Sequence, residues 1–134
     1  MKIKPLFNLF LILIMASIAI GCARTSPIQN VSNAPVTTVT TGKKYTLTDV
    51  RDAIMRAGAS LGWQMQDVAP GHIVGTLYIR SHMAQVDIKY STIAYSITYK
   101  DSSNLKYDGT KIHSNYNGWI QNLDKAIKIQ LSTM

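Results

Sequence analysis

Between residues 63 and 100 the sequence alternates apolar and polar side chains, and this alternation constrains the fold most strongly. A period of two residues is typical of strands with one face on a core and the other in water. Four such stretches follow one another, at 63–68, 73–80, 84–90 and 91–100. Only short connections separate them, whereas parallel strands require crossovers of a dozen or more residues. The sequence therefore predicts an antiparallel meander of about four strands.

Aromatic side chains take part in the alternation of the last two stretches. Ile93, Tyr95, Ile97 and Tyr99 share one register. Because successive side chains of a strand point to opposite faces, we expect all four to face the core. Tyr78 lies in the opposite register of the second stretch, and we expect it to point to solvent.

A helical period appears on both sides of the meander. The apolar residues of "TLTDVRDAIMRAGASLGW" fall on one helix face, which predicts a helix over 49–61 with Thr48 as N-cap and Gly62 as its C-terminal stop. A second helix is expected from about Asn115, with Ser114 or Asn115 as its N-cap. The two apolar stripes and the apolar sheet face can be buried together. The predicted fold is thus α+β, a two-layer sandwich of helix, meander and helix, with both helices on one sheet face.

The N-terminus has the layout of a secretory signal peptide. Lys2 and Lys4 precede the apolar run "LFNLFLILIMASIAI", which is followed by small residues. The run holds about 15 residues, fewer than the roughly 20 that span a bilayer as a helix. A removable signal peptide over 1–21 is therefore favoured over a retained membrane anchor.

Cys22 is the only cysteine of the chain, so it cannot form an internal disulfide. "AIGC" at 19–22 resembles the lipobox of bacterial lipoproteins, in which the cysteine thiol is acylated and the preceding peptide is removed. Ala19 stands where leucine is preferred, although that position tolerates small apolar residues. The resemblance implies a lipid anchor at Cys22, because acyl chains hold a protein stably on a membrane. The other interpretation is a buried, inert cysteine.

The chain after the signal peptide divides into two parts. Residues 22–42 are rich in Ser, Thr, Asn and Pro without a helical period, which predicts a lipidated cysteine followed by a flexible tether. "VTTVTT" at 36–41 could add an edge strand. Removing 21 residues from the 134-residue chain leaves 113, enough for one domain. We expect that single α+β domain at 43–134.

Charge restricts the partners of an exported domain. The chain holds 14 Lys and Arg against 7 Asp, and it has no glutamate. A basic domain could contact anionic lipid headgroups, lipopolysaccharide or acidic glycan. The basic residues are scattered along the sequence, however, which favours a solvated surface over a binding patch. The export signal argues against nucleic acid.

Residues with catalytic or metal-binding chemistry form no recognisable motif. His72 and His82 flank one predicted strand and should lie at opposite ends of the sheet, so a metal site with His113 is not expected. The sequence has no GxSxG, no phosphate-binding glycine loop and no nucleotide motif. We expect no catalytic residues, no cofactor, no metal and no enzymatic activity.

The window "KIHSNYNGWIQNL" at 111–123 combines two kinds of side chain. Its large apolar members fall at helical spacing and predict a core stripe of Tyr116, Trp119, Ile120 and Leu123. Its polar members, His113, Asn115 and Asn117, are expected to face outward near the turn at Asp108-Gly109. They form a candidate partner contact, and capping and packing are the alternative. The segment around Asp108-Gly109 is predicted to be either a small hairpin or an ordered loop.

The order of lipobox, polar tether, helix, meander and helix resembles that of small bacterial envelope lipoproteins. "LGW", "APGHIVGTL", "DIKYS" and "NYNGWIQNL" carry the resemblance. Because Ala23 rather than Asp follows the cysteine, it implies the outer membrane. We expect a lipid-anchored, non-enzymatic module that contacts an envelope protein or the cell wall. The alternative is a binder of a small apolar ligand or lipid, with a cavity next to Tyr95, Tyr99 and Trp119.

Overall fold

The computed structural model describes residues 24–36 and 44–134. Within these residues the chain forms seven strands and two helices. In order they are β1 (Thr25–Pro27), β2 (Val31–Pro35), α1 (Leu47–Ser60), β3 (Gln64–Ala69), β4 (His72–Ile79), β5 (His82–Tyr90), β6 (Ala94–Ser103), β7 (Lys111–His113) and α2 (Ser114–Ser132). The predicted signal peptide, Cys22 and most of the "VTTVTT" segment lie outside the described residues.

The larger sheet has five antiparallel strands in the order β2-β6-β5-β4-β3, and β1 pairs with β7 in a second, two-stranded sheet. Strands β3 to β6 form the predicted meander, which confirms the α+β class and the antiparallel sheet. The expected number of about four strands is too low, because β2 adds to the edge of the sheet beside β6. A β-bulge interrupts the pairing of β5 with β6 between Gln85 and Val86.

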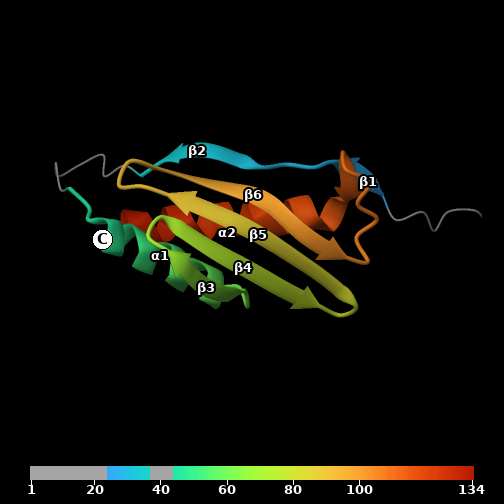
Figure 1. Ribbon diagram of the computed structural model, residues 1–134, viewed down its shortest axis with the longest axis horizontal. Helices are drawn as coiled ribbons and strands as arrows, with labels where there is room; N and C mark the ends of the chain where they lie inside the picture. The colour runs from blue at the N-terminus through green and yellow to red at the C-terminus, as the bar shows by residue number, and fades with distance from the viewer. Residues whose placement is uncertain (1–23, 37–43) are drawn as a thin grey trace, which may run out of the picture.

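The helices cover one face of the five-stranded sheet. In Figure 1, α2 runs behind the strands, and α1 lies beside α2 towards the β3 edge. The sheet contributes alternating residues to the core, such as Ile73, Leu77, Val86, Ile88 and Ile97, each at most 5% exposed. The helices contribute Val50, Ala53, Ile54, Ala57, Tyr116, Ile120, Leu123 and Ile127. The predicted core stripes of both helices are confirmed for most of their members. Trp119 and Ala126 of α2 are only partly buried, and Leu61, which was expected to end the stripe of the first helix, is 41% exposed.

The flexible tether predicted for residues 22–42 is wrong where the structure describes it. Residues 24–36 carry β1 and β2, and the folded domain therefore includes residues well before 43. Polar side chains attach the segment to β6: Asn30 accepts a hydrogen bond from the backbone N–H of Tyr99 at 3.1 Å, and the backbone N–H of Asn33 donates to Ser96 at 2.9 Å. The polar composition of the segment is typical of a linker. Its hydrogen-bond partners could not be recognised from composition, because they lie more than 60 residues away in the sequence.

Helix α1 starts two residues earlier than predicted, and its N-cap is Thr46 rather than Thr48. Thr46 and Asp49 form a capping box, in which each side chain accepts a hydrogen bond from the other residue's backbone N–H. At the C-terminal end Gly62 has a φ of +85°, a conformation that glycine adopts at little cost. The predicted glycine stop at Gly62 is confirmed.

The predicted facing of the aromatic side chains is confirmed, whereas that of Ile93 is wrong. Tyr95 is 1% exposed and Tyr78 is 64% exposed. Ile93 is 75% exposed because it lies in the β5–β6 turn and not in a strand. Thr92 and Ile93 therefore form a turn tip, which the weak sequence break at this point did not reveal.

The connection between β6 and β7 includes the turn at Asp108-Gly109. Asp108 Oδ1 accepts hydrogen bonds from the backbone N–H groups of Thr110 and Lys111, which lower the pKa of the carboxyl group. The backbone N–H of His113 donates to Leu105 O at 2.8 Å. Of the two sequence-based alternatives, the ordered loop is therefore the one observed. The small hairpin is not formed, because β7 pairs with the distant β1 and not with a strand across the turn.

Candidate functional site

A groove of about 480 Å³ opens between the start of α1 and the β3–β4 turn. Leu47, Thr48 and Arg51 of α1 line one side, and the segment 67–70 and Tyr90 line the rest. The volume lies within the range of small-molecule sites. Its charged lining residues are Arg51 and Asp67.

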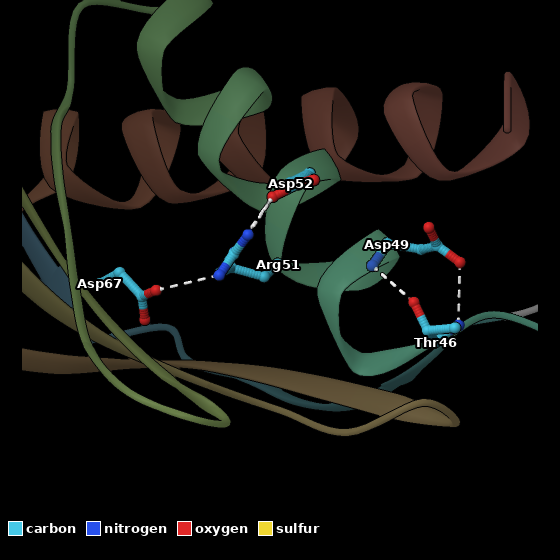
Figure 2. Close-up of polar contacts among 5 residues, drawn as sticks. All are labelled: Thr46, Asp49, Arg51, Asp52 and Asp67. Atoms are coloured by element: carbon cyan, nitrogen blue, oxygen red, sulfur yellow. Dashed lines mark hydrogen bonds and ion pairs between the residues drawn. The ribbon is translucent and has the colours of Figure 1, made fainter.

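Arg51 is the central charged group of this groove, and its charge is balanced. Its Nε and Nη2 donate to Asp52 Oδ1 at 3.0 Å, and Nη1 donates to Asp67 Oδ2 at 3.5 Å (Figure 2). The hydrogen bond and negative charge of Asp52 raise the pKa of the guanidinium group, with a smaller contribution from Asp67. Two carboxylates next to one guanidinium leave no net positive charge for an anionic ligand. These contacts join α1 to β3, and the neighbouring Asp49 caps the helix through Thr46 (Figure 2).

The candidate partner contact of His113, Asn115 and Asn117 lies at the start of α2. His113 is the N-cap, because its Nδ1 accepts a hydrogen bond from the backbone N–H of Asn115 at 3.1 Å. The expected caps Ser114 and Asn115 are therefore inside the helix. Asn115 is exposed and His113 is half-buried, whereas Asn117 is 5% exposed. The expectation that all three face outward is wrong for Asn117.

Asn117 holds the N-terminal segment against α2. Its Oδ1 accepts from the backbone N–H of Gln29 at 3.0 Å, and its Nδ2 donates to Ser26 Oγ at 2.9 Å and to Pro27 O at 3.0 Å. Gln121 donates to the side chain of Gln29 one helical turn further on. The amide of Asn117 is thus fully used inside the protein, which makes it a structural residue.

No local sequence signal revealed this arrangement. The partners of Asn117 lie about 90 residues away in the chain. The single hint was the low helix propensity of asparagine, which suggests that Asn117 has a role other than helix formation. Ser26 and Gln29 belong to the segment that was taken for a tether.

A small ring cluster adjoins His113. The rings of His82 and His113 lie 5.9 Å apart between centroids, and those of His82 and Trp119 lie 6.3 Å apart. His82 Nδ1 is 2.8 Å from the carbonyl oxygen of Asn104, so this nitrogen carries the donated hydrogen. His72 lies at the other end of β4, as expected. Among the residues that the structure describes, no three His, Cys, Asp or Glu side chains are placed to hold a metal ion.

We call this region of the molecule the β1–β7 end. It comprises β1, β7, the first turn of α2, the β6–β7 connection and the β4–β5 turn, which lie towards the right in Figure 1. Hydrogen bonds join its parts: Ser114 N–H donates to Arg24 O at 2.9 Å, and Asn104 Nδ2 donates to Ser81 Oγ at 2.8 Å. The candidate contact residues His113 and Asn115 thus belong to a surface assembled from distant segments.

The sheet face opposite the helices is polar. Exposed residues in the outward register include Gln64, Gln66, Tyr78, Lys89 and Thr98. On this face His72 Nε2 lies 2.7 Å from Asp87 Oδ1, and Lys100 Nζ lies 3.9 Å from the same oxygen. This face therefore offers hydrogen-bonding side chains from β3, β4, β5 and β6.

Tyr95, Tyr99 and Trp119, next to which an apolar cavity was expected, have separate surroundings in the structure. Tyr95 packs in the core and its hydroxyl donates to Asp124 Oδ1 at 2.5 Å; burial, followed by this contact, raises the pKa of the phenol. Tyr99 stacks on Tyr107 with ring centroids 4.1 Å apart. Trp119 borders a separate groove of about 160 Å³, which is smaller than most small-molecule sites. The groove is lined by Leu61, Trp63, Leu77, Ile79, Trp119 and Asn122.

Two further findings bear on function. Neither α1 nor α2, the helices within the described residues, has the length and apolar character that crossing a bilayer demands. No family model, curated protein or solved structure matches the chain.

Proposed function

We propose that the protein is a lipid-anchored lipoprotein of the bacterial envelope, attached through Cys22, which presents a small non-enzymatic interaction module to an envelope partner. The observation that carries the proposal is the position of the only cysteine, directly after a basic and then apolar N-terminal segment. The sequence "AIGC" supports acylation of its thiol. Ala23 supports the outer membrane as the location.

The charged groups of the described residues support a module without catalysis. Arg51, the central charge of the larger groove, is balanced by Asp52 and Asp67. His82 and His113 use their Nδ1 atoms in hydrogen bonds that hold a loop and a helix start. Arg51, His82 and His113 thus have structural roles, and none of them has to be assigned a catalytic role.

The partner of the module is a protein assembly or the cell wall. The polar sheet face supports such a contact, because side chains such as Gln64, Gln66 and Thr98 offer both donors and acceptors. Most of the exposed side chains on this face are polar, although Tyr78 is exposed there as well, and this suits a partner that is bound mainly through hydrogen bonds.

A binder of a small apolar ligand is the second candidate. The groove between Trp63 and Trp119 supports it, since five of its six lining residues are apolar. Its small volume favours a fragment such as a single ring or short acyl segment. A change in the intrinsic tryptophan fluorescence on titration with short-chain lipids would support this candidate, and an unchanged spectrum would exclude it.

The lipid anchor is tested by expressing the full chain in a Gram-negative bacterium and fractionating the cells. We expect a membrane-bound chain whose intact mass matches residues 22–134 plus acyl groups. Cys22→Ser should abolish both the added mass and the processing, whereas Ser17→Ala in the same apolar run should change neither. Equal membrane attachment and processing of the Cys22→Ser variant would refute the proposal.

A further inference from the structure

The folded domain begins almost at the proposed anchor. The carbonyl oxygen of Arg24 accepts a hydrogen bond from the backbone N–H of Ser114, and Thr25 pairs with His113. Only Ala23 stands between Arg24 and Cys22. Consecutive Cα atoms are about 3.8 Å apart, so the Cα atoms of Cys22 and Arg24 lie within about 8 Å of each other. An acylated Cys22 would therefore hold the β1–β7 end at the bilayer surface.

The same end gathers four exposed cations from four distant parts of the sequence. Arg24 precedes β1, Arg80 lies in the β4–β5 turn, Lys106 lies in the β6–β7 connection and Lys111 begins β7. The contacts of Asn104 with His82 and Ser81 hold the β4–β5 turn against the β6–β7 connection. The cations look scattered along the sequence, and the tertiary structure brings them to one end.

These four cations differ from others in the described residues. Arg51, Lys100 and Lys128 form ion pairs with aspartates, whereas none of the four does so with any described residue. Two carboxylates, Asp101 and Asp108, lie on the same end and reduce its charge. The Asp108 carboxylate faces the backbone N–H groups of Thr110 and Lys111. A net positive charge remains.

An aromatic side chain accompanies the cations. Tyr107 is 39% exposed and stacks on Tyr99. Tyrosine favours the boundary between headgroups and acyl chains, because its ring is apolar and its hydroxyl is polar. Cations next to such a ring suit the surface of an anionic bilayer.

We propose that the β1–β7 end lies on the membrane and binds anionic phospholipid headgroups through Arg24, Arg80, Lys106 and Lys111. This inference rests on the proposed acylation of Cys22 and specifies how the anchored domain is oriented. The opposite end, with the β5–β6 turn, then points away from the bilayer. Strand β5 alone spans roughly 27 Å between the two ends.

The chain allows a clean labelling experiment, since Cys22 is its only cysteine and acylation blocks its thiol. Thr110→Cys places a probe at the β1–β7 end, and Thr92→Cys places a matched probe in the β5–β6 turn; both threonines are exposed. The acylated full chain carries a fluorophore at one position and is reconstituted into vesicles of phosphatidylcholine with or without phosphatidylglycerol. A quencher on the lipid headgroups reports contact.

We expect several-fold stronger quenching of the Thr110 probe than of the Thr92 probe, and a larger difference with phosphatidylglycerol. The variant Arg80→Gln, Lys106→Gln, Lys111→Gln should reduce the difference. Each cation at an anionic surface raises the ratio of the bound to the detached orientation about fivefold. Loss of three cations therefore lowers this ratio on the order of a hundredfold. The control Lys44→Gln, Lys89→Gln, Lys125→Gln removes the same charge from exposed lysines elsewhere and should have little effect.

Equal quenching of the two probes would overturn the proposed orientation. A difference of the same size with and without phosphatidylglycerol, and unchanged in the first triple variant, would overturn headgroup binding. These outcomes are separate from a failure of the lipid anchor. A chain that lacks the added acyl mass and reacts with two equivalents of thiol reagent would show that Cys22 is free.

Discussion

The two helices begin in different ways, and the difference separates local from distant information. Helix α1 starts at Thr46, whose capping partner Asp49 is three residues away. Helix α2 starts at His113, and its first turns bind β1 and the following residues through Asn117, about 90 residues away. The start of α1 depends on side chains within four consecutive residues. The start of α2 depends on contacts with a segment that lies far away in the sequence.

This contrast explains why the start of α2 looked like a site. A run of His, Asn and aromatic residues is typical of binding surfaces, and the same side chains serve equally well to hold a buried polar contact. Asn117 performs the second role, whereas the exposed Asn115 beside it does not. The two asparagines therefore provide a matched pair for mutation.

The largest effect is expected from Asn117→Ala. It removes three hydrogen bonds and leaves Gln29 N–H and Pro27 C=O without their partner. Because buried polar groups without partners are costly, we expect the free energy of unfolding to fall by about 2–3 kcal/mol. Urea denaturation measures this change, and hydrogen exchange at Gln29 should show local loosening.

Asn115→Ala is the control, and it should change stability by less than about 0.5 kcal/mol because the side chain is exposed. Equal effects of the two substitutions would mean that α2 does not hold the N-terminal segment in the manner described.

A second comparison uses one glycine from each helix. A Cβ on Gly58 of α1 would lie 2.3 Å from Met65 Sδ, whereas a Cβ on Gly118 of α2 would meet nothing within 4 Å. Gly58→Ala should destabilise the protein by about 1–3 kcal/mol through overpacking. Gly118→Ala should stabilise it by about 0.5–1 kcal/mol, because alanine is the better helix former.

The midpoints of thermal unfolding of the two variants show whether each substitution lowers or raises stability. A loss of stability in Gly118→Ala would indicate a close backbone approach at α2. A neutral Gly58→Ala would mean that the flexible Met65 side chain moves aside at no cost.

A loss of stability smaller than that of Asn117→Ala is expected at the local start of α1. Thr46→Ala removes the side-chain half of the capping box and should cost about 1 kcal/mol. Thr48→Ala, the position favoured by the sequence pattern, should cost clearly less because Thr48 lies inside the helix. Comparison of the two midpoints in urea tests the assignment, and a larger loss for Thr48→Ala would reverse it.

Much of the fold followed from short-range patterns. Alternation between residues 63 and 100 predicted four antiparallel strands, since side-chain direction in a strand depends only on position along it. Helical spacing predicted the buried faces of α1 and α2, and Gly62 marked the end of α1. The exposed position of Ile93 was missed, because a turn two residues long leaves little trace in a continuing alternation.

The candidate site depended on information that no short window contains. His113 and Asn115 were recognised as a polar group, yet the inward orientation of Asn117 depends on Ser26, Pro27 and Gln29. The contact of His113 with His82 likewise joins residues from separate strands. Pairing partners at such separations are selected by packing of the whole chain, so local composition cannot reveal them.

By itself the sequence determined the α+β class, the central meander, the faces of the helices and the expectation of an anchor at Cys22. These properties arise from side-chain periodicity and from short contiguous motifs. Only the tertiary structure decided that residues 24–36 carry the strands β1 and β2, that Asn117 holds this segment, and that Arg24, Arg80, Lys106 and Lys111 share one end. Each of these depends on long-range pairing, in which backbone and side-chain groups are satisfied by partners far away in the chain.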